Sequence, residues 1–161
     1  MKKTILSFFI LFLFTGNVFS AGSSGGDGGN KSNYDQAVKL IKSAKKDEEK
    51  GKKDKASSKY EKAFKLLVKS NKEKPNKADT LNYLGFTSRK LGDFENGEKY
   101  YLQGLELDPN HIGINEYLGE LYVATNRHNL AVERLEVLKS CNCEEYEELK
   151  AIIAGEKVSK Y

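Results

Sequence analysis

Residues 78–110 read ADTLNYLGFTSRKLGDFENGEKYYLQGLELDPN, and this stretch decides the fold. Its first part is amphipathic and breaks at Gly92. A second amphipathic part follows, in which glycines flank Tyr101 at helical spacing, and it closes at Pro109. Because glycine interrupts a helix and proline belongs in connectors, the stretch predicts two helices joined by a tight turn.

The same spacing recurs at two other places in the chain. Moved 34 residues forward, the positions of Leu84, Gly85, Gly97, Tyr101 and Gly104 fall on Leu118, Gly119, Ala131, Leu135 and Leu138. Moved 41 residues back, the positions of Gly85, Gly92, Gly97, Tyr101 and Gly104 fall on Ala44, Gly51, Ala56, Tyr60 and Ala63. Small residues let two antiparallel helices cross closely, so we expect Tyr60, Tyr101 and Leu135 to seat against them.

This pattern resembles the tetratricopeptide repeat, which combines an L-G pair, small–aromatic–small spacing and a proline over about 34 residues. The resemblance implies an all-α helix–turn–helix solenoid of about three repeats with a C-terminal capping helix. The repeats would cover about 37–70, 78–111 and 112–145, and the closing helix 144–157. The sequence departs from the family pattern at Ser43, Ser88 and Cys143, where Leu, a large aromatic and Pro are expected.

Local signals place the ends of the helices. The expected helices are 34–50, 54–72, 77–91, 94–107, 111–125, 128–140 and 144–157. Gly51, Gly92 and Asn126 stand where a left-handed residue would end a helix. Asp93 and Asn142 are the predicted N-caps of the helices that follow them.

The N-terminus predicts a targeting segment, residues 1–20. Lys2 and Lys3 precede an apolar run of eleven residues, TILSFFILFLF, and Val18 and Ser20 are small residues before a cut. This order is typical of a secretory signal peptide, with cleavage expected before Ala21, and the run is short for a membrane span. An uncleaved anchor is the alternative.

Residues 21–33 are rich in Gly and Ser and predict a flexible linker, so the repeat domain is expected over 34–161. Charge is uneven beyond the linker: residues 31–77 hold 16 lysines and 7 acidic residues, whereas 78–161 hold 9 basic and 15 acidic residues. The lysines are interleaved with Asp and Glu, which favours a solvated surface over a nucleic-acid site.

Cys141 and Cys143 form the one reactive-looking motif. Two cysteines in an exported protein most often pair, which predicts a disulfide that pins the last repeat to the closing helix. A bond across so small a ring would be strained, so a labile redox pair or an intermolecular link is the alternative. The arrangement also resembles exported bacterial tetratricopeptide proteins with a Cys pair before a Glu-Glu-Tyr closing helix.

The family resemblance also implies a concave face, lined by the first helix of each repeat, that takes peptide ligands. Carried over by position, the predicted groove consists of Asn82, Phe86, Arg89, Lys90, Glu116, Glu120 and Val123. The first repeat would add Ile41, Lys45, Glu48 and Glu49. The family's basic clamp for a terminal carboxylate is absent here, because Tyr83 and Glu116 stand among its positions. Phe86 beside Arg89 is the expected hot spot, although Phe86 packing on its neighbouring repeat is an equal alternative.

The family resemblance, together with the N-terminal signal, implies a non-enzymatic protein-interaction module, scaffold or assembly factor in the bacterial cell envelope. We expect a protein or peptide partner, no cofactor, no metal and no specific nucleic acid. His111 and His128 have no paired ligand spacing with the cysteines. Two alternatives stay open: an anionic-surface binder acting through residues 31–77, which would bind lipid, lipopolysaccharide or nucleic acid, and a self-associating structural protein or homo-oligomer. The signal predicts export, with the periplasm favoured and secretion as the alternative.

Overall fold

The computed structural model describes residues 31–159, which form seven α-helices and no strand. The prediction of an all-α fold is therefore confirmed. The helices are α1 (Asn33–Glu49), α2 (Lys53–Glu73), α3 (Ala78–Lys90), α4 (Phe94–Leu107), α5 (Ile112–Ala124), α6 (His128–Leu138) and α7 (Glu144–Ile153). The closing helix, expected over 144–157, ends at Ile153. The predicted signal peptide and linker residues 21–30 lie outside the described residues.

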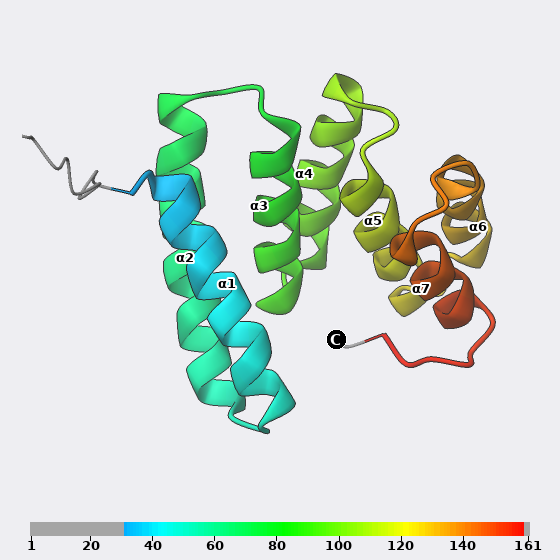
Figure 1. The fold of residues 1–161 in the computed structure, drawn as a ribbon, viewed down its shortest axis with the longest axis horizontal. Helices are drawn as coiled ribbons and strands as arrows, with labels where there is room; N and C mark the ends of the chain where they lie inside the picture. The colour runs from blue at the N-terminus through cyan, green and yellow to red at the C-terminus, as the bar shows by residue number, and fades with distance from the viewer. Residues whose placement is uncertain (1–30, 160–161) are drawn as a thin grey trace, which may run out of the picture. The chain divides into compact units, whose positions relative to one another are not determined.

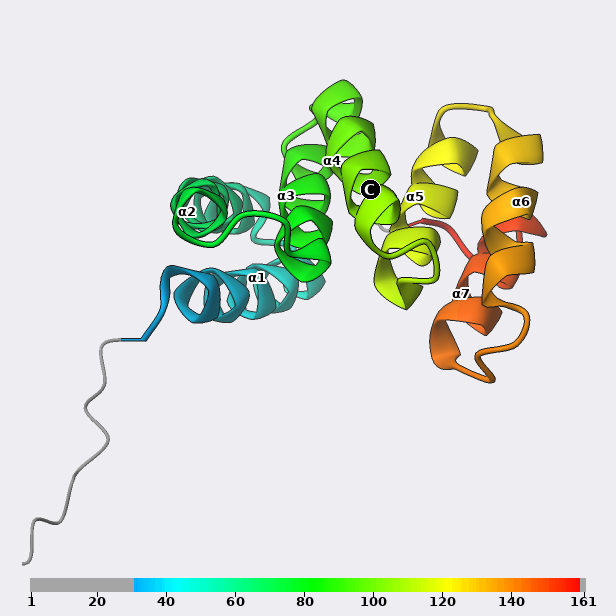
Figure 2. The same ribbon diagram turned by 90° about the horizontal axis from the view of Figure 1, so that it is seen from above.

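The helices pair along the chain as hairpins. α1 packs on α2, α3 on α4 and α5 on α6, while α7 lies against both α5 and α6. Figures 1 and 2 show the three hairpins of residues 31–159 following one another in chain order, with α7 beside the last pair. The first helices of successive hairpins also touch, because α3 contacts both α1 and α5. No helix within residues 31–159 is long and apolar enough to cross a bilayer.

The predicted helix ends are set by residues with positive φ. Gly51, Gly92 and Asn126 have φ of 70°, 84° and 59°, so each adopts the left-handed conformation expected from the sequence. This conformation turns the chain out of the helix and lets the next helix return antiparallel. The tight turns of all three hairpins therefore follow from local chemistry.

The two predicted N-caps have different outcomes. Asp93 does cap α4, because its carboxylate accepts a hydrogen bond from the Asn96 N–H at 3.1 Å. Asn142 does not cap α7: its φ is 49°, and Cys143 takes the cap position without a side-chain hydrogen bond. The prediction for Asn142 is wrong because this asparagine makes the left-handed turn that precedes the helix.

The buried side chains form two clusters. The first joins α1, α2 and α3 around Tyr60, Leu67 and Leu84, and the second surrounds Tyr101 and Leu118. Both tyrosines are at most 1% exposed. Their burial is what the small–aromatic–small spacing predicts, since each ring fills the space between two closely crossing helices.

Glycines on α3 and α5 let side chains of neighbouring helices pack directly against the helix backbone. A Cβ on Gly85 would lie 2.5 Å from the Tyr101 ring, so this glycine seats the ring as expected. At the equivalent Gly119 the nearest atoms belong to Leu149 of α7, at 2.5 Å, and not to Leu135. Leu135 itself is half-buried. The prediction for Leu135 is therefore wrong: α6 still packs on α5, but the side chain that lies against Gly119 comes from the closing helix.

Candidate functional site

A cavity of about 780 Å³ lies along the first helices of the three hairpins. α1, α3 and α5 supply most of its wall, and the start of α2, the start of α4, α7 and the segment after α7 complete it. Its lining residues are Lys45, Glu48, Glu49, Lys53, Ser57, Tyr60, Phe86, Arg89, Lys90, Gly92, Phe94, Glu116, Tyr117, Glu120, Glu148, Ile152 and Ser159. The cavity therefore combines aromatic rings with charged groups of both signs.

Arg89 joins α3 to α5 beneath the cavity. Its side chain is fully buried, and its Nη1 donates a hydrogen bond to the Tyr117 carbonyl oxygen at 2.7 Å. Its Nη2 lies 3.8 Å from a carboxylate oxygen of Glu120. A buried guanidinium needs such partners because its charge has lost its hydration. Arg89 is therefore a structural part of the cavity floor as well as a charged group of the site.

Aromatic rings form one wall of the cavity. The Phe86 ring lies 5.8 Å from the Tyr60 ring and 5.1 Å from the Tyr117 ring, measured between centroids. The Lys45 ammonium stands 4.6 Å from the Phe86 centroid and donates a hydrogen bond to the Tyr117 hydroxyl at 3.2 Å. Phe86 is only 3% exposed. Its main contacts in the structure are therefore with neighbouring repeats.

An ion pair between Lys90 of α3 and Glu48 of α1 lies on the α1 side of the cavity. The Lys90 ammonium lies 2.7 Å from one carboxylate oxygen of Glu48, and the Tyr60 hydroxyl donates to the other oxygen at 2.9 Å. Burial and the hydrogen bond to Glu48 raise the pKa of Tyr60 above its usual range. The tyrosine therefore stays neutral and holds the Glu48 carboxylate in place for Lys90.

Two glutamates of α5 face the cavity one helical turn apart. Glu116 is 9% exposed and Glu120 is 5% exposed. Burial raises the pKa of Glu116 to about 8, and the neighbouring Glu120, Glu145 and Glu148 add to this shift. Burial also raises the pKa of Glu120, against the opposing effect of Arg89. The Ser159 hydroxyl donates a hydrogen bond to Glu120 at 2.9 Å.

The structure brings five of the seven predicted groove residues to this cavity: Phe86, Arg89, Lys90, Glu116 and Glu120. Lys45, Glu48 and Glu49 of the first repeat line it too, whereas Ile41 belongs to the core.

Two predicted groove residues lie elsewhere. Asn82 is buried beside Gly113, and Val123 is half-buried against the second core cluster.

Sequence reasoning missed several lining residues. Tyr117 was visible as an aromatic on the first helix of a repeat, next to the predicted Glu116. Glu148, Ile152 and Ser159 gave no comparable signal, because they lie beyond the repeats and no repeat position maps onto them.

Cys141 and Cys143 lie in the connection between α6 and α7, away from the cavity. Their Cα atoms are 5.2 Å apart, and their sulfur atoms stand at bonding distance. We predict that titration of the native protein will find no reactive thiol and that reduction will release two. A monomer band on a non-reducing gel separates the intramolecular bond from a link between chains. Two reactive thiols before reduction would rule out the disulfide between Cys141 and Cys143.

The two histidines lie at the N-terminal ends of two different helices, α5 and α6. His111 Nδ1 accepts a hydrogen bond from the Ile114 N–H at 3.2 Å and so caps α5, while His128 begins α6. Among residues 31–159, no three His, Cys, Asp or Glu side chains lie together in a way that could hold a metal ion.

Comparisons with known proteins agree with this geometry. The family model described as "Tetratricopeptide repeat" matches residues 78–111. No curated protein sequence matches the chain.

Three solved structures share the arrangement of helices. One is the "First TPR of Spaghetti (RPAP3) bound to HSP90 peptide SRMEEVD", with 18% identity, a TM-score of 0.55, and coverage of 81% of this chain and 100% of that chain. The second TPR domain of human RPAP3 in complex with the HSP70 peptide SGPTIEEVD has 18% identity, a TM-score of 0.52, and coverage of 76% and 98%. The Arabidopsis OM64 TPR domain has 12% identity, a TM-score of 0.50, and coverage of 78% and 100%. The chain therefore carries a tetratricopeptide repeat at residues 78–111 and folds as a tetratricopeptide-type helical solenoid.

Proposed function

We propose that this protein is a non-enzymatic interaction module that binds an extended segment of a partner protein in the cavity along α1, α3 and α5. The observation that carries the proposal is the cavity itself, about 780 Å³ in volume and lined by aromatic and charged side chains. Sites of this size, with an apolar wall and a few placed polar groups, are typical of ligand recognition. Aromatic residues and Arg often dominate interface energies, and here Phe86, Tyr117 and Arg89 lie together.

The similar structures support a peptide ligand. The two RPAP3 domains are described in complex with peptides of HSP90 and HSP70. In this chain the first helices of the hairpins line the cavity, and their side chains are held by contacts between repeats. A preformed wall of this kind lowers the entropic cost of ordering the site when a segment binds.

We also propose that the protein works outside the cytoplasm, as a scaffold or assembly factor of the bacterial cell envelope. The basis is the sequence of residues 1–20, which has the basic start, the apolar run and the small residues of a signal peptide. The periplasm is the favoured location, and secretion is the alternative. The interaction should therefore be sought in intact exporting cells.

Photo-crosslinking at the cavity rim tests the function directly. Phe94 begins α4, lines the cavity and is 38% exposed, so a photoreactive amino acid there should capture the bound partner. Leu102 on the same helix is 45% exposed and does not line the cavity, which makes it the matched control. We expect a discrete crosslinked species from position 94 and not from position 102, with the partner identified by mass spectrometry.

The result also separates this proposal from the two alternatives. Equal crosslinking from both positions, or none from position 94, would contradict binding in the cavity. Binding that collapses between low and physiological salt would instead favour an electrostatic surface on α1 and α2. A crosslink to a second copy of the chain would support self-association.

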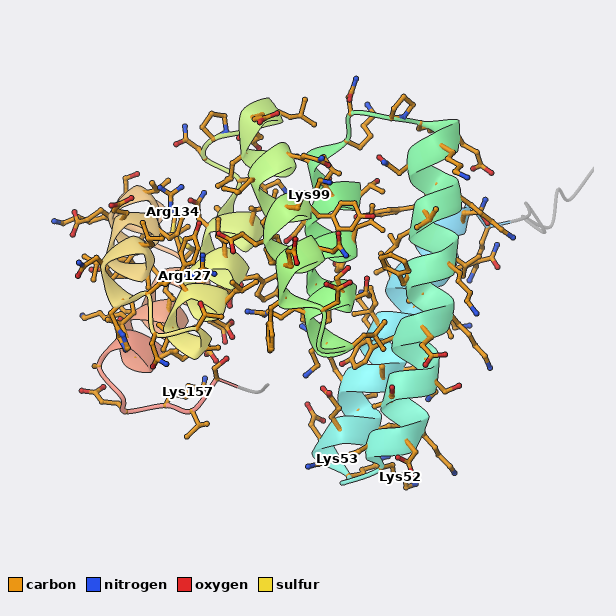
Figure 3. All side chains as sticks on the ribbon, turned by 180° about the vertical axis from the view of Figure 1, so that it is seen from behind. Lys52, Lys53, Lys99, Arg127, Arg134 and Lys157 are labelled. Atoms are coloured by element: carbon orange, nitrogen blue, oxygen red, sulfur yellow. A yellow bond between two sulfur atoms is a disulfide. The ribbon has the colours of Figure 1, made fainter. Side chains whose placement is uncertain are left out.

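The cations labelled in Figure 3 belong to separate elements, with Lys52 and Lys53 beside the α1–α2 turn, Lys99 on α4 and Lys157 after α7.

A further inference from the structure

Glu116 presents a largely buried carboxyl group to the cavity. It is 9% exposed and lines the cavity, and none of the hydrogen bonds or ion pairs found among residues 31–159 involves its carboxyl oxygens, which stay in contact with solvent on the cavity side. Partial burial of a carboxyl group costs stability unless partners compensate it, so a group that faces a cavity in this way is a candidate for contact with a ligand. Glu120 lies one turn further along α5, and the two carboxyl groups share one face of that helix.

The charged groups around the pair come from three other helices. Lys45 approaches from α1, Arg89 from α3, and Glu145 and Glu148 from α7. Arg89 compensates Glu120, at 3.8 Å, and the Lys45 ammonium is engaged by the Phe86 and Tyr117 rings. The α7 glutamates add negative potential. The pair therefore forms an acidic part of the cavity that would attract a positive charge from outside, although the Lys45 charge already acts on both carboxyl groups.

The C-terminal part of this chain already places a hydrogen-bond donor beside the acid pair. Residues 155–159, here called the tail, follow α7 and turn back past α5 (Figure 1). Gly155 reverses the chain with φ of 73°, and Lys157 forms an ion pair with Glu148. Ser159 then donates its hydroxyl hydrogen bond to Glu120 and lines the cavity. An extended segment with hydrogen-bond donors thus fits beside the acid pair.

We propose that Glu116 and Glu120 recognise a lysine side chain of a basic, extended partner segment, and that the tail occupies part of the same place until the partner displaces it. This inference rests on the proposed function and names the chemistry of the partner. A lysine ammonium has three donors, enough for both carboxyl groups at once. An acidic segment would bring like charges together and would be rejected.

Binding of a cation should depend on pH. Burial holds the pKa of Glu116 at about 8 in the free protein, so the carboxyl group carries a proton at neutral pH. A bound ammonium favours the carboxylate, so binding releases this proton. Affinity should therefore rise as the pH increases from about 6 to 8, because less free energy is needed to ionise Glu116.

The probe is a fluorescent peptide with the sequence of residues 157–161, KVSKY, blocked at both ends, and its charge-reversed partner EVSEY. Binding is measured by anisotropy to the full chain and to the Lys157→Ala/Ser159→Ala variant, which loses both tail contacts. We expect the variant to bind KVSKY several-fold more tightly than the wild type and to bind EVSEY hardly at all. In the same background Glu116→Gln should weaken KVSKY binding by about tenfold or more, because the charge partner is lost.

Glu106→Gln on the exposed surface of α4 is the matched control and should change KVSKY binding less than twofold, within the scatter that screened surface charges show. Equal effects of Glu116→Gln and Glu106→Gln, equal binding of the two peptides, or no binding of KVSKY would each overturn the acid-pair proposal. Partner capture from position 94 that persists alongside such a result would leave the proposed function intact and reject only the basic segment. Unchanged affinity on releasing the tail would show that the tail does not occupy the site.

Discussion

Tyr101→Ala is expected to lower the free energy of unfolding by about 3–5 kcal/mol, the range for removing a large buried aromatic side chain. The Tyr101 side chain is 0% exposed and belongs to the second core cluster. Its ring also fills the space above Gly85, so its loss leaves a cavity between α3 and α4. Denaturant unfolding followed by far-UV circular dichroism measures the loss. Tyr100→Ala, next in sequence but half-buried, is the control and should cost much less.

The same contact predicts a reversal of sign at Gly85. With Tyr101 present, Gly85→Ala places a Cβ 2.5 Å from the ring and should destabilise the fold by about 1–3 kcal/mol through overpacking. In the Tyr101→Ala background that clash is gone. Alanine should then stabilise α3 by about 1 kcal/mol, its advantage over glycine within a helix. Additive effects in this double-mutant cycle would show that the glycine and the ring do not act as a pair.

The stability of the protein should fall as the pH rises from about 4.5 to 8, with Glu116 as the main cause. The pKa of Glu116 is about 8 in the folded protein, against 4.5 for an ordinary glutamate. Between these values the folded state holds a proton that the unfolded state has released. Linkage then requires the free energy of unfolding to decrease with pH, by up to about 1.4 kcal/mol per pH unit.

Glu116→Gln removes this titration and should flatten the pH profile. We expect the free energy of unfolding of the variant, relative to the wild type, to increase by about 2 kcal/mol or more between pH 5 and pH 8. Glu106→Gln serves again as the control and should follow the wild-type profile, because Glu106 is exposed. A Glu116→Gln profile parallel to that of the wild type would show that Glu116 ionises normally in the folded protein.

Glu116→Gln is expected to change stability and binding in opposite directions. Glutamine at this position should stabilise the free protein at high pH and weaken the binding of a basic peptide. A fold that would be more stable with a neutral side chain, yet carries a glutamate in its cavity, fits the general pattern of polar groups held unfavourably at binding sites. The two measurements together distinguish a binding role of Glu116 from a purely structural one.

The sequence by itself determined the hairpins. Gly51, Gly92 and Asn126 take the left-handed turns that their positions predicted, and Tyr60 and Tyr101 are buried as their spacing required. These features depend on residues within a few turns of one another. Helical periodicity and turn chemistry are local properties, so the printed sequence already contains them.

The cavity wall was only partly predictable from the sequence. Repeat register places Phe86, Arg89 and Glu116 on the inner faces of first helices, and the structure gathers them at one cavity. The repeat register, however, does not determine how far each helix is rotated about its axis relative to the next repeat, and this rotation decides which side chains reach the cavity. Asn82 and Val123 share the inner-face register, yet they lie beside Gly113 and against the second core cluster.

Only the tertiary structure decided what closes the last repeat and what surrounds the acid pair. Leu149 of α7, rather than Leu135, fills the space at Gly119, and Ser159 returns to Glu120 across 39 positions of sequence. The closing helix and the tail follow no repeat, so no periodicity predicts where they lie. Their places are set by packing on a surface that exists only once the hairpins have assembled. The burial that raises the pKa of Glu116 arises in the same way, from helices distant in sequence.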